Sequence, residues 1–269
     1  MRPLIGAGQV AGLARPVLLD VRWTLGGPSR EADYRRGHLP DAVWIDFEHQ
    51  VCGPVGETGG RHPLPDPAAF QEAMREAGVD QDSSVVVYDD GDGMAAARTW
   101  WTLRWAGHDD VRVLDGGLRA WTEAGHPLDR TEPAPERGDF TVRPGRLEVL
   151  DAESAARWAA ERELVDVRAP ERYRGENEPV DPVAGHIPGA VNLPISGDGA
   201  PEGGFADADS LRARYEPHRE AAFYCGSGVG AARAALAATA AGLPTPPVYV
   251  GSWSDWISRD RAIATGEEH

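Results

Sequence analysis

The feature that most constrains this chain is that its second half repeats the landmarks of its first half in the same order. The repeats lie about 140 residues apart, which is far too long a period for a solenoid and indicates a duplicated domain. Spacing between the landmarks drifts, as expected if loops were inserted after duplication. The paired segments are 18–23 with 164–169, 37–43 with 185–191, 86–88 with 222–224, and 116–121 with 251–256.

Each half alternates short buried-type apolar runs with helical patterns, which is typical of a parallel sheet. The fold class predicted is therefore α/β, with two tandem domains, each a parallel sheet with helices on both faces. The predicted strands are 17–21, 85–88, 111–114, 164–167, 222–224 and 248–250. The predicted helices are 67–77, 94–106, 117–124, 152–162, 208–215 and 230–241.

Domain boundaries follow from a stretch without periodicity. Residues 129–145 carry three prolines and several charges, which favours a connecting segment. We therefore predict a first domain at 1–130, a linker at 131–148 and a second domain at 149–269.

The composition excludes several chemistries. All 27 basic residues are Arg, so no lysine is available for a Schiff base or for a phosphate-binding P-loop. A formal net charge of -16 argues against nucleic-acid binding. No apolar stretch is long enough for a membrane helix. Two Cys are too few for a disulfide scaffold, and this favours a reducing, cytoplasmic location.

One cysteine is placed as a nucleophile would be. Cys225 follows a predicted strand, and an alanine-rich helix comes next, so the intervening loop and the helix N-terminus form a cradle for anions. Such a cradle favours the thiolate form and would hold a charged sulfur species. The alternative is a buried core cysteine, which fits poorly with so many glycines. The loop after Cys225 consists of Gly226, Ser227, Gly228, Val229 and Gly230.

Two contrasts sharpen this interpretation. Cys52 lies in a loop without such a context and is interpreted as a spectator thiol. In the first half, Asp89 stands where Cys225 stands, so we expect only the second domain to be catalytic and the first to be inactive. A tyrosine-phosphatase loop would need Arg at position 231, where the chain has Ala, so phosphate chemistry is disfavoured.

The chain resembles the tandem-domain rhodaneses and 3-mercaptopyruvate sulfurtransferases over essentially its whole length. The motifs that carry the resemblance are Gly-His-Leu-Pro-Asp-Ala at 37–42, Gly-His-Ile-Pro-Gly-Ala at 185–190, the acidic loop 89–94 and Gly-Ser-Trp-Ser-Asp-Trp at 251–256. The resemblance implies that Cys225 takes sulfur from a small anionic donor and becomes a persulfide. An acceptor such as cyanide, a small thiol or thioredoxin then removes the outer sulfur.

The donor is left open between mercaptopyruvate and thiosulfate. Small neutral residues at Gly226 and Ser227 favour mercaptopyruvate, because thiosulfate-preferring relatives often carry basic residues there. Ser227 either acts on the substrate, by relaying a proton or by hydrogen-bonding its carbonyl, or only stabilises the loop. A third alternative is a noncatalytic module that carries persulfide for a partner.

The resemblance also implies a carboxylate site made of two arginines. Arg172 matches the first, whereas the second would fall near Val180 and is absent, with Arg174 as a conceivable substitute. A second departure is Gly230, where the family usually has Thr.

Three further residues are candidates for the site. The resemblance places His38 at the cleft as an acid–base helper, although its twin His186 points to a structural role. Asp166 likewise has a twin in Asp20, which favours a structural carboxylate over a substrate contact. Trp23 has no aromatic twin, and this suggests that it walls the pocket.

Neither a metal nor a cofactor is expected. The eight His and two Cys show no zinc-type spacing. The acidic loop that begins at Asp89 has Trp100 at the twelfth position, where a calcium-binding EF-hand needs Glu.

Overall fold

The computed structural model describes residues 2–200 and 203–267, and the chain divides into two compact units. The first contains Met1–Gly53, Pro65–Arg146 and Ala200–Phe205, and the second contains Pro54–Leu64, Leu147–Gly199 and Ala206–His269. Each unit therefore includes a short segment from the other half of the sequence. The segment 54–64 belongs with the second unit, which becomes important at the candidate site.

The two units contain five-stranded sheets with the same strand order, and every pairing is parallel. The first sheet runs β1 (Leu4–Ile5), β5 (Val111–Leu114), β4 (Val85–Tyr88), β2 (Val17–Asp20) and β3 (Val43–Trp44). The second runs β6 (Val149–Leu150), β10 (Val248–Tyr249), β9 (Ala222–Tyr224), β7 (Leu164–Asp166) and β8 (Ala190–Asn192). The matching order confirms the predicted fold class and the duplication.

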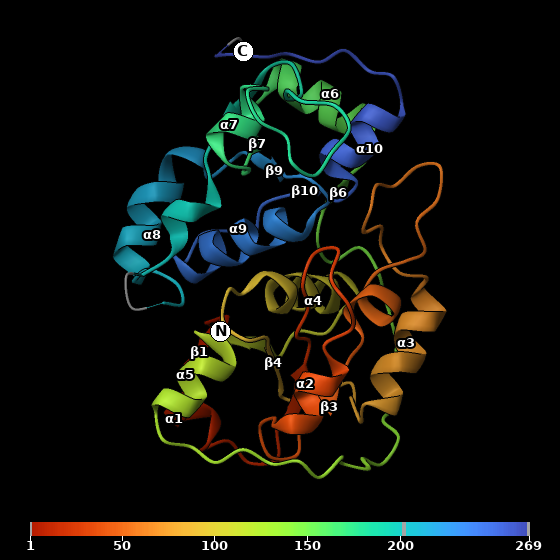
Figure 1. Ribbon diagram of the computed structural model, residues 1–269, viewed down its shortest axis with the longest axis vertical. Helices are drawn as coiled ribbons and strands as arrows, with labels where there is room; N and C mark the ends of the chain where they lie inside the picture. Colours follow the sequence, from red (N-terminus) through yellow and green to blue (C-terminus); the bar gives the residue numbers. More distant parts are fainter. Residues whose placement is uncertain (1, 201–202, 268–269) are drawn as a thin grey trace. The chain divides into compact units, whose positions relative to one another are not determined.

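Helices surround each sheet (Figure 1). In the first unit they are α1 (Ala7–Val10), α2 (Glu31–Arg36), the π-helical turn η1 (Phe47–Val51), α3 (Pro67–Glu76), α4 (Met94–Trp105) and α5 (Gly117–Glu123). In the second they are α6 (Ala152–Glu161), α7 (Pro170–Tyr173), the 3₁₀ turns η2 (Ile195–Asp198) and η3 (Glu216–His218), α8 (Ala208–Tyr215), α9 (Val229–Ala240) and α10 (Ser252–Ser258).

Strand alternation in β9 shows how the second sheet is covered on both faces. Ala222 and Tyr224 belong to a core cluster with residues of α6 and α10. Phe223, between them, points the other way and packs against Tyr215 of α8, with ring centroids 5.8 Å apart. The buried helix α9 packs against β9 and β10 and lies beside α8 (Figure 1).

The segment predicted as a linker packs closely on the first unit. Phe140 is fully buried, and the Arg75 guanidinium donates to its backbone carbonyl at 2.7 Å. At Gly138, a side chain would place its Cβ only 2.1 Å from the backbone oxygen of Val79, so the chain can pass here only without one. Residues 131–146 are thus part of the first unit.

Within the described ranges, no helix combines the length and the apolar character needed to cross a membrane.

Candidate active site

Cys225 lies directly after β9, at the carboxyl edge of the second sheet. Its Sγ accepts a hydrogen bond from the backbone N–H of Gly228 at 3.1 Å. Gly228 has a φ of +82° and caps α9, so the chain turns from strand into helix through a conformation that suits glycine. Cys225 is 6% exposed, so its thiol lies at the positive end of the α9 helix dipole in a nearly closed space.

The repeated motif near the C-terminus holds this loop from the other side. The first turn of α10 donates two backbone hydrogen bonds, from Trp253 to the Cys225 carbonyl at 2.9 Å and from Ser254 to the Gly226 carbonyl at 3.0 Å. Ser252 Oγ accepts from the Cys225 N–H at 3.1 Å and lies 3.9 Å from the sulfur. Ser252 also has a φ of +55°, which is unusual for a residue with a side chain. The loop geometry is therefore fixed by two elements, α9 and α10.

A buried histidine that the sequence analysis missed contacts the loop. His62 Nδ1 lies 2.8 Å from Ser227 Oγ, and the two residues are 3% and 6% exposed. The proton lies on the nitrogen or on the hydroxyl according to the tautomer of His62, so the pair is able to pass a proton. One sequence signal was available: the second half has no His matching His62, whereas His38 has a twin.

Segment 54–64 reaches the loop because it packs against the start of α10. The Arg61 backbone N–H donates to Ser254 Oγ at 3.1 Å. At Gly60, whose φ is +77°, an added Cβ would lie 2.3 Å from the Gly251 carbonyl oxygen, so only glycine allows this approach. The close packing explains why two consecutive residues, Arg61 and His62, enter the site.

Arg172 lies beside the loop, where the resemblance places a substrate-binding arginine. It sits on α7, and a Cβ built on Gly226 would be 3.4 Å from its Nη2. The same Cβ would be 3.1 Å from Nη2 of Arg61. Because Gly226 has no side chain, two guanidinium groups have room next to the backbone that follows Cys225.

The guanidinium group that lies next to that of Arg172 belongs to Arg61 and not to a residue near Val180. Next to Val180 the chain has Asp181, whose carboxylate accepts hydrogen bonds from both Arg61 and Arg172. Arg174, the conceivable substitute, instead pairs with Glu176 at 2.9 Å.

Side-chain charges around the loop are balanced. The arginines around the loop are each paired with at least one carboxylate, so any positive potential at this loop of an acidic protein does not come from a surplus of arginine. It rests on backbone N–H groups, the α9 N-terminus and the guanidinium edges that face Gly226. The arginines are Arg61, Arg168 and Arg172, and the acids are Asp166, Glu178 and Asp181.

Asp166 and its twin make the same contacts. Asp166 accepts from Nη2 of Arg168 at 2.6 Å, and Asp20 accepts from Nη2 of Arg22 at 2.8 Å. In both units that arginine also donates to a glycine carbonyl of the Gly-His motif. A contact present in both units, only one of which has the cysteine, supports the structural interpretation of Asp166.

His38 also repeats the contacts of its twin. Its Nδ1 lies 2.9 Å from the Tyr34 carbonyl, its Nε2 lies 3.2 Å from the Thr131 carbonyl, and its ring stacks on Tyr34. His186 Nδ1 lies 2.7 Å from the Tyr173 carbonyl, and its ring stacks on Tyr173. His38 is fully buried with both ring nitrogens bonded, which favours a structural role over acid–base help.

Trp23 and Cys52 also lie in the first unit. Trp23 Nε1 donates to Glu48 Oε1 at 2.6 Å, and its ring packs against Phe47. Cys52 is 3% exposed, and burial raises the pKa of its thiol to about 12. A thiol with that pKa stays protonated near neutral pH, which agrees with a spectator role.

Gly230 leaves space beside the sulfur. It lies inside α9 rather than in the turn. A Cβ there would meet Ile195 Cδ1 at 3.4 Å and Cys225 Sγ at 3.6 Å, which is ordinary van der Waals contact. The absence of the family's usual Thr therefore removes a hydroxyl without loosening the turn itself.

In the first unit the equivalent loop is occupied by its own carboxylate. Asp89 Oδ1 accepts from the N–H groups of Gly91 at 2.9 Å and Gly93 at 3.2 Å, and Oδ2 accepts from Ala96 at 3.1 Å. The backbone donors that would cradle an anion are thus already used. This agrees with the expectation that the first unit is inactive.

Asp89 leads to a prediction about stability. Burial, with a smaller effect of the Asp92 charge, raises the pKa of Asp89 to about 6 from 3.8. Because the folded form holds this proton more tightly, the contribution of Asp89 to stability is complete below pH 4 and is lost as the pH rises to about 6. The loss amounts to roughly 3 kcal/mol.

The variant Asp89→Asn lacks this titration. We expect its free energy of unfolding, minus that of the wild type, to rise between pH 4 and pH 7, as measured by urea denaturation at several pH values. A difference that does not change with pH would contradict the assignment.

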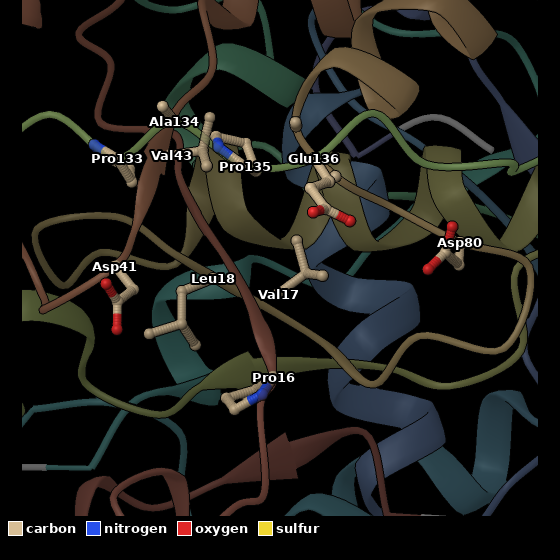
Figure 2. Close-up of a pocket in the computed structure, with 12 residues that line it drawn as sticks. Pro16, Val17, Leu18, Asp41, Val43, Asp80, Pro133, Ala134, Pro135 and Glu136 are labelled. Carbon is tan, nitrogen blue, oxygen red and sulfur yellow. The ribbon is translucent and has the colours of Figure 1, made fainter.

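A cavity of about 420 Å³ lies in the first unit (Figure 2). It is bordered by Pro16, Pro133 and Pro135 and by the carboxylates of Asp41, Asp80 and Glu136. It contains no nucleophile, and we assign it no chemistry. Over the described residues, no group of His, Cys, Asp and Glu side chains is suited to hold a metal ion.

Comparison with known proteins agrees with this architecture. The pattern of the rhodanese-like domain matches residues 5–124 and 148–259. A probable 3-mercaptopyruvate sulfurtransferase of Pseudomonas aeruginosa is 42% identical over 98% of both chains. A putative thiosulfate sulfurtransferase, SseB, of Mycobacterium tuberculosis is 41% identical over 95% of this chain and 94% of its own. The crystal structure of SseA from Escherichia coli, a 3-mercaptopyruvate sulfotransferase, superposes with a TM-score of 0.80 at 30% identity, covering 94% of this chain and all of that one.

Two parallel sheets of identical order and a cysteine loop on only one of them define the class of tandem-domain α/β proteins with a single thiol site. The chain belongs to the family of tandem-domain rhodaneses and 3-mercaptopyruvate sulfurtransferases. It is accordingly an enzyme, a sulfurtransferase, which moves sulfur from a donor to an acceptor.

Proposed function

We propose that this sulfurtransferase takes its sulfur from 3-mercaptopyruvate, holds it as a persulfide on Cys225 and passes it to a thiol or to cyanide. The observation that carries the proposal is the buried pair of Ser227 and His62 next to the cysteine. A carbonyl-containing donor needs a proton when its carbon–sulfur bond breaks, and this pair is placed to supply one.

The first half-reaction begins with attack of the Cys225 thiolate on the donor sulfur. A sulfur–sulfur bond forms, and the carbon–sulfur bond breaks with its electron pair going to carbon. The resulting enolate of pyruvate takes up a proton and leaves as pyruvate. The Gly228 N–H, which points at Sγ, stabilises negative charge on the sulfur in the manner of an oxyanion hole.

In the second half-reaction the acceptor attacks the outer sulfur of the persulfide. The sulfur–sulfur bond breaks, and its electron pair returns to Cys225 as a thiolate. With cyanide the product is thiocyanate, and with a thiol such as that of thioredoxin the product is a new persulfide. The thiolate is then ready for the next donor.

Thiosulfate is the alternative donor, favoured by the 41% identity to a protein named as a putative thiosulfate sulfurtransferase. It carries two charges, and breaking its sulfur–sulfur bond releases sulfite without any need for a proton. The pairing of every arginine near the loop with a carboxylate speaks against this dianion.

Steady-state assays with each donor and cyanide, measuring thiocyanate, test the proposal. We expect kcat/KM for mercaptopyruvate to exceed that for thiosulfate by about tenfold or more. The reverse ratio would make the protein a thiosulfate:cyanide sulfurtransferase. If a donor loads one sulfur atom onto Cys225, seen by mass spectrometry, but no thiocyanate forms with either donor, the chain is a persulfide carrier and the proposal fails.

A further inference from the structure

One member of the Ser227 and His62 pair lies on a segment whose own backbone does not fix its position. His62 comes shortly after Gly59 and Gly60, whose φ values are +94° and +77°, and residues 54–58 before them are exposed. Two consecutive glycines give the backbone wide conformational freedom. The contacts that fasten this segment therefore decide whether His62 Nδ1 stays 2.8 Å from Ser227 Oγ.

One buried carboxylate fastens the segment to the second sheet. Asp255 lies on α10 and is 2% exposed. Its Oδ1 accepts a hydrogen bond from the backbone N–H of Gly59 at 2.7 Å, and its Oδ2 accepts one from the hydroxyl of Tyr249, on β10, at 2.6 Å. Nε of Arg259 also donates to Oδ1, at 2.9 Å. Asp255 thus joins the glycine turn before His62 to the second sheet.

The energetics of a buried charge make this contact a strong one. Taking the Asp255 carboxylate out of water is costly, and its three donors offset that cost. The bond from the Gly59 N–H is charge-assisted, and such bonds are shorter and stronger than those between neutral groups. Without the carboxylate, this N–H would lose the acceptor that holds the turn in place.

The duplication shows that the fold of this region does not require the acid. In the repeated motif near the C-terminus, Asp255 stands where the first half has Ala120. The two positions have the same local packing, because a Cβ built on Gly116 would lie 2.7 Å from Ala120 Cβ and one built on Gly251 would lie 2.6 Å from Asp255 Cβ. The first unit, which has no cysteine at the equivalent loop, builds the same helix with alanine. The acid therefore accompanies the unit that carries the thiol.

We infer that Asp255 is a positioning residue for sulfur transfer, which holds segment 54–64 so that the imidazole of His62 meets the hydroxyl of Ser227. Asp255 acts through His62 and takes no part in the bonds that form and break. The inference deepens the proposed function, on which it rests, because it assigns the placement of the proton-transferring pair to one side chain.

The test compares the two donors in variants of Asp255. Asp255→Ala copies the residue of the first unit, so we expect it to fold, and kcat with mercaptopyruvate should fall roughly tenfold or more because the pair is misplaced. Turnover with thiosulfate should fall much less, since sulfite leaves without a proton. Asp255→Leu, which fills the space without an acceptor, should show the same pattern. Asp255→Asn, whose Oδ1 can still accept from Gly59, should recover most of the loss.

Arg259→Gln is the matched control. The Arg259 side chain is 36% exposed and donates to the same carboxylate, but it lies on the side of α10 away from the Gly59 bond's partner segment in sequence. Exposed ion pairs contribute little to stability, so we expect wild-type rates. A loss equal to that of Asp255→Ala would mean that the stability of α10, and not the bond to segment 54–64, sets the rate. Equal losses with both donors in Asp255→Ala would overturn the inference in the same way.

A double variant tests whether Asp255 acts through His62. In the His62→Ala background, adding Asp255→Ala should lower kcat with mercaptopyruvate little further, because the side chain that Asp255 positions is already absent. Losses that multiply would show that Asp255 acts by another route, and the inference would fail.

Hydrogen exchange separates failure of this inference from failure of the proposed function, because it needs no donor. We expect peptides that cover residues 54–64 to exchange faster in Asp255→Ala than in the wild type, and peptides of the central strand β9 to exchange at the same rate. Unchanged exchange of 54–64 would overturn the inference, whichever donor the wild type prefers. Faster exchange with unchanged turnover of mercaptopyruvate would overturn it as well. A wild-type preference for thiosulfate would instead refute the proposed donor and leave the exchange result as it stands.

Discussion

Cys225→Ser is expected to abolish sulfur transfer, with a loss of roughly 10³-fold or more in kcat for either donor. A serine hydroxyl remains protonated near neutral pH and does not form a persulfide, so the first half-reaction has no nucleophile. Serine is only slightly smaller than cysteine. Its Oγ can still accept the hydrogen bond that the Gly228 N–H donates to Sγ in the wild type. We therefore expect the variant to fold. Thiocyanate formation and the mass of the donor-treated protein are the measurements.

Cys52→Ser is the matched control for this experiment. Cys52 is the other cysteine of the chain, lies in the first unit, and has a pKa raised by burial to about 12. Its thiol has no access to the chemistry, so turnover should stay nearly intact even if burying a hydroxyl costs about 1–2 kcal/mol of stability. Comparable losses in the two variants, with both proteins folded, would overturn the assignment of Cys225.

Sequence reasoning located the central strands because they are continuous buried runs. Val85–Tyr88 and Ala222–Tyr224 are fully apolar apart from their terminal tyrosines and lie in the middle of their sheets. The edge strands Leu4–Ile5 and Val149–Leu150 were not predicted. Each has only two residues, which is too short to show a periodicity, and each pairs with a neighbouring strand on one side only. Pattern strength followed burial, and burial is lowest at the edges.

In the candidate site, contacts between residues close in the sequence were predictable, whereas contacts between distant residues were not. The Cys225 loop was predictable because strand, glycine turn and helix follow one another in the sequence. His62 contacts Ser227 across 165 positions, and Arg61 contacts Asp181 across 120. Such contacts depend on how segment 54–64 packs against α10, which no pattern within eleven residues encodes. The duplication was informative about structural residues, because a residue with a counterpart in the other half is expected to serve the fold. His38 and Asp166 do repeat the contacts of their twins.

Removing the Ser227 and His62 pair should have the second largest effect. With mercaptopyruvate we expect Ser227→Ala and His62→Ala each to lower kcat by roughly 10²-fold, because proton delivery to the departing enolate is lost. If the two side chains act as one relay, the double variant should lose no more than the single ones, so the double-mutant cycle shows strong coupling. Stopped-flow measurement of pyruvate release gives the rate of this half-reaction directly.

Thiosulfate distinguishes a proton relay from a merely structural pair. Sulfite leaves without taking up a proton, so turnover with thiosulfate should fall much less in both variants than turnover with mercaptopyruvate. His49→Ala provides a control, since the His49 side chain is 81% exposed and pairs with Asp46 at the start of η1; both rates should be unchanged. Equal losses with the two donors would mean that Ser227 and His62 hold the loop in shape, and losses that simply multiply in the double variant would mean that they act separately. In either case the hydrogen bond at 2.8 Å would be structural, and the strongest support for mercaptopyruvate as the donor would be gone.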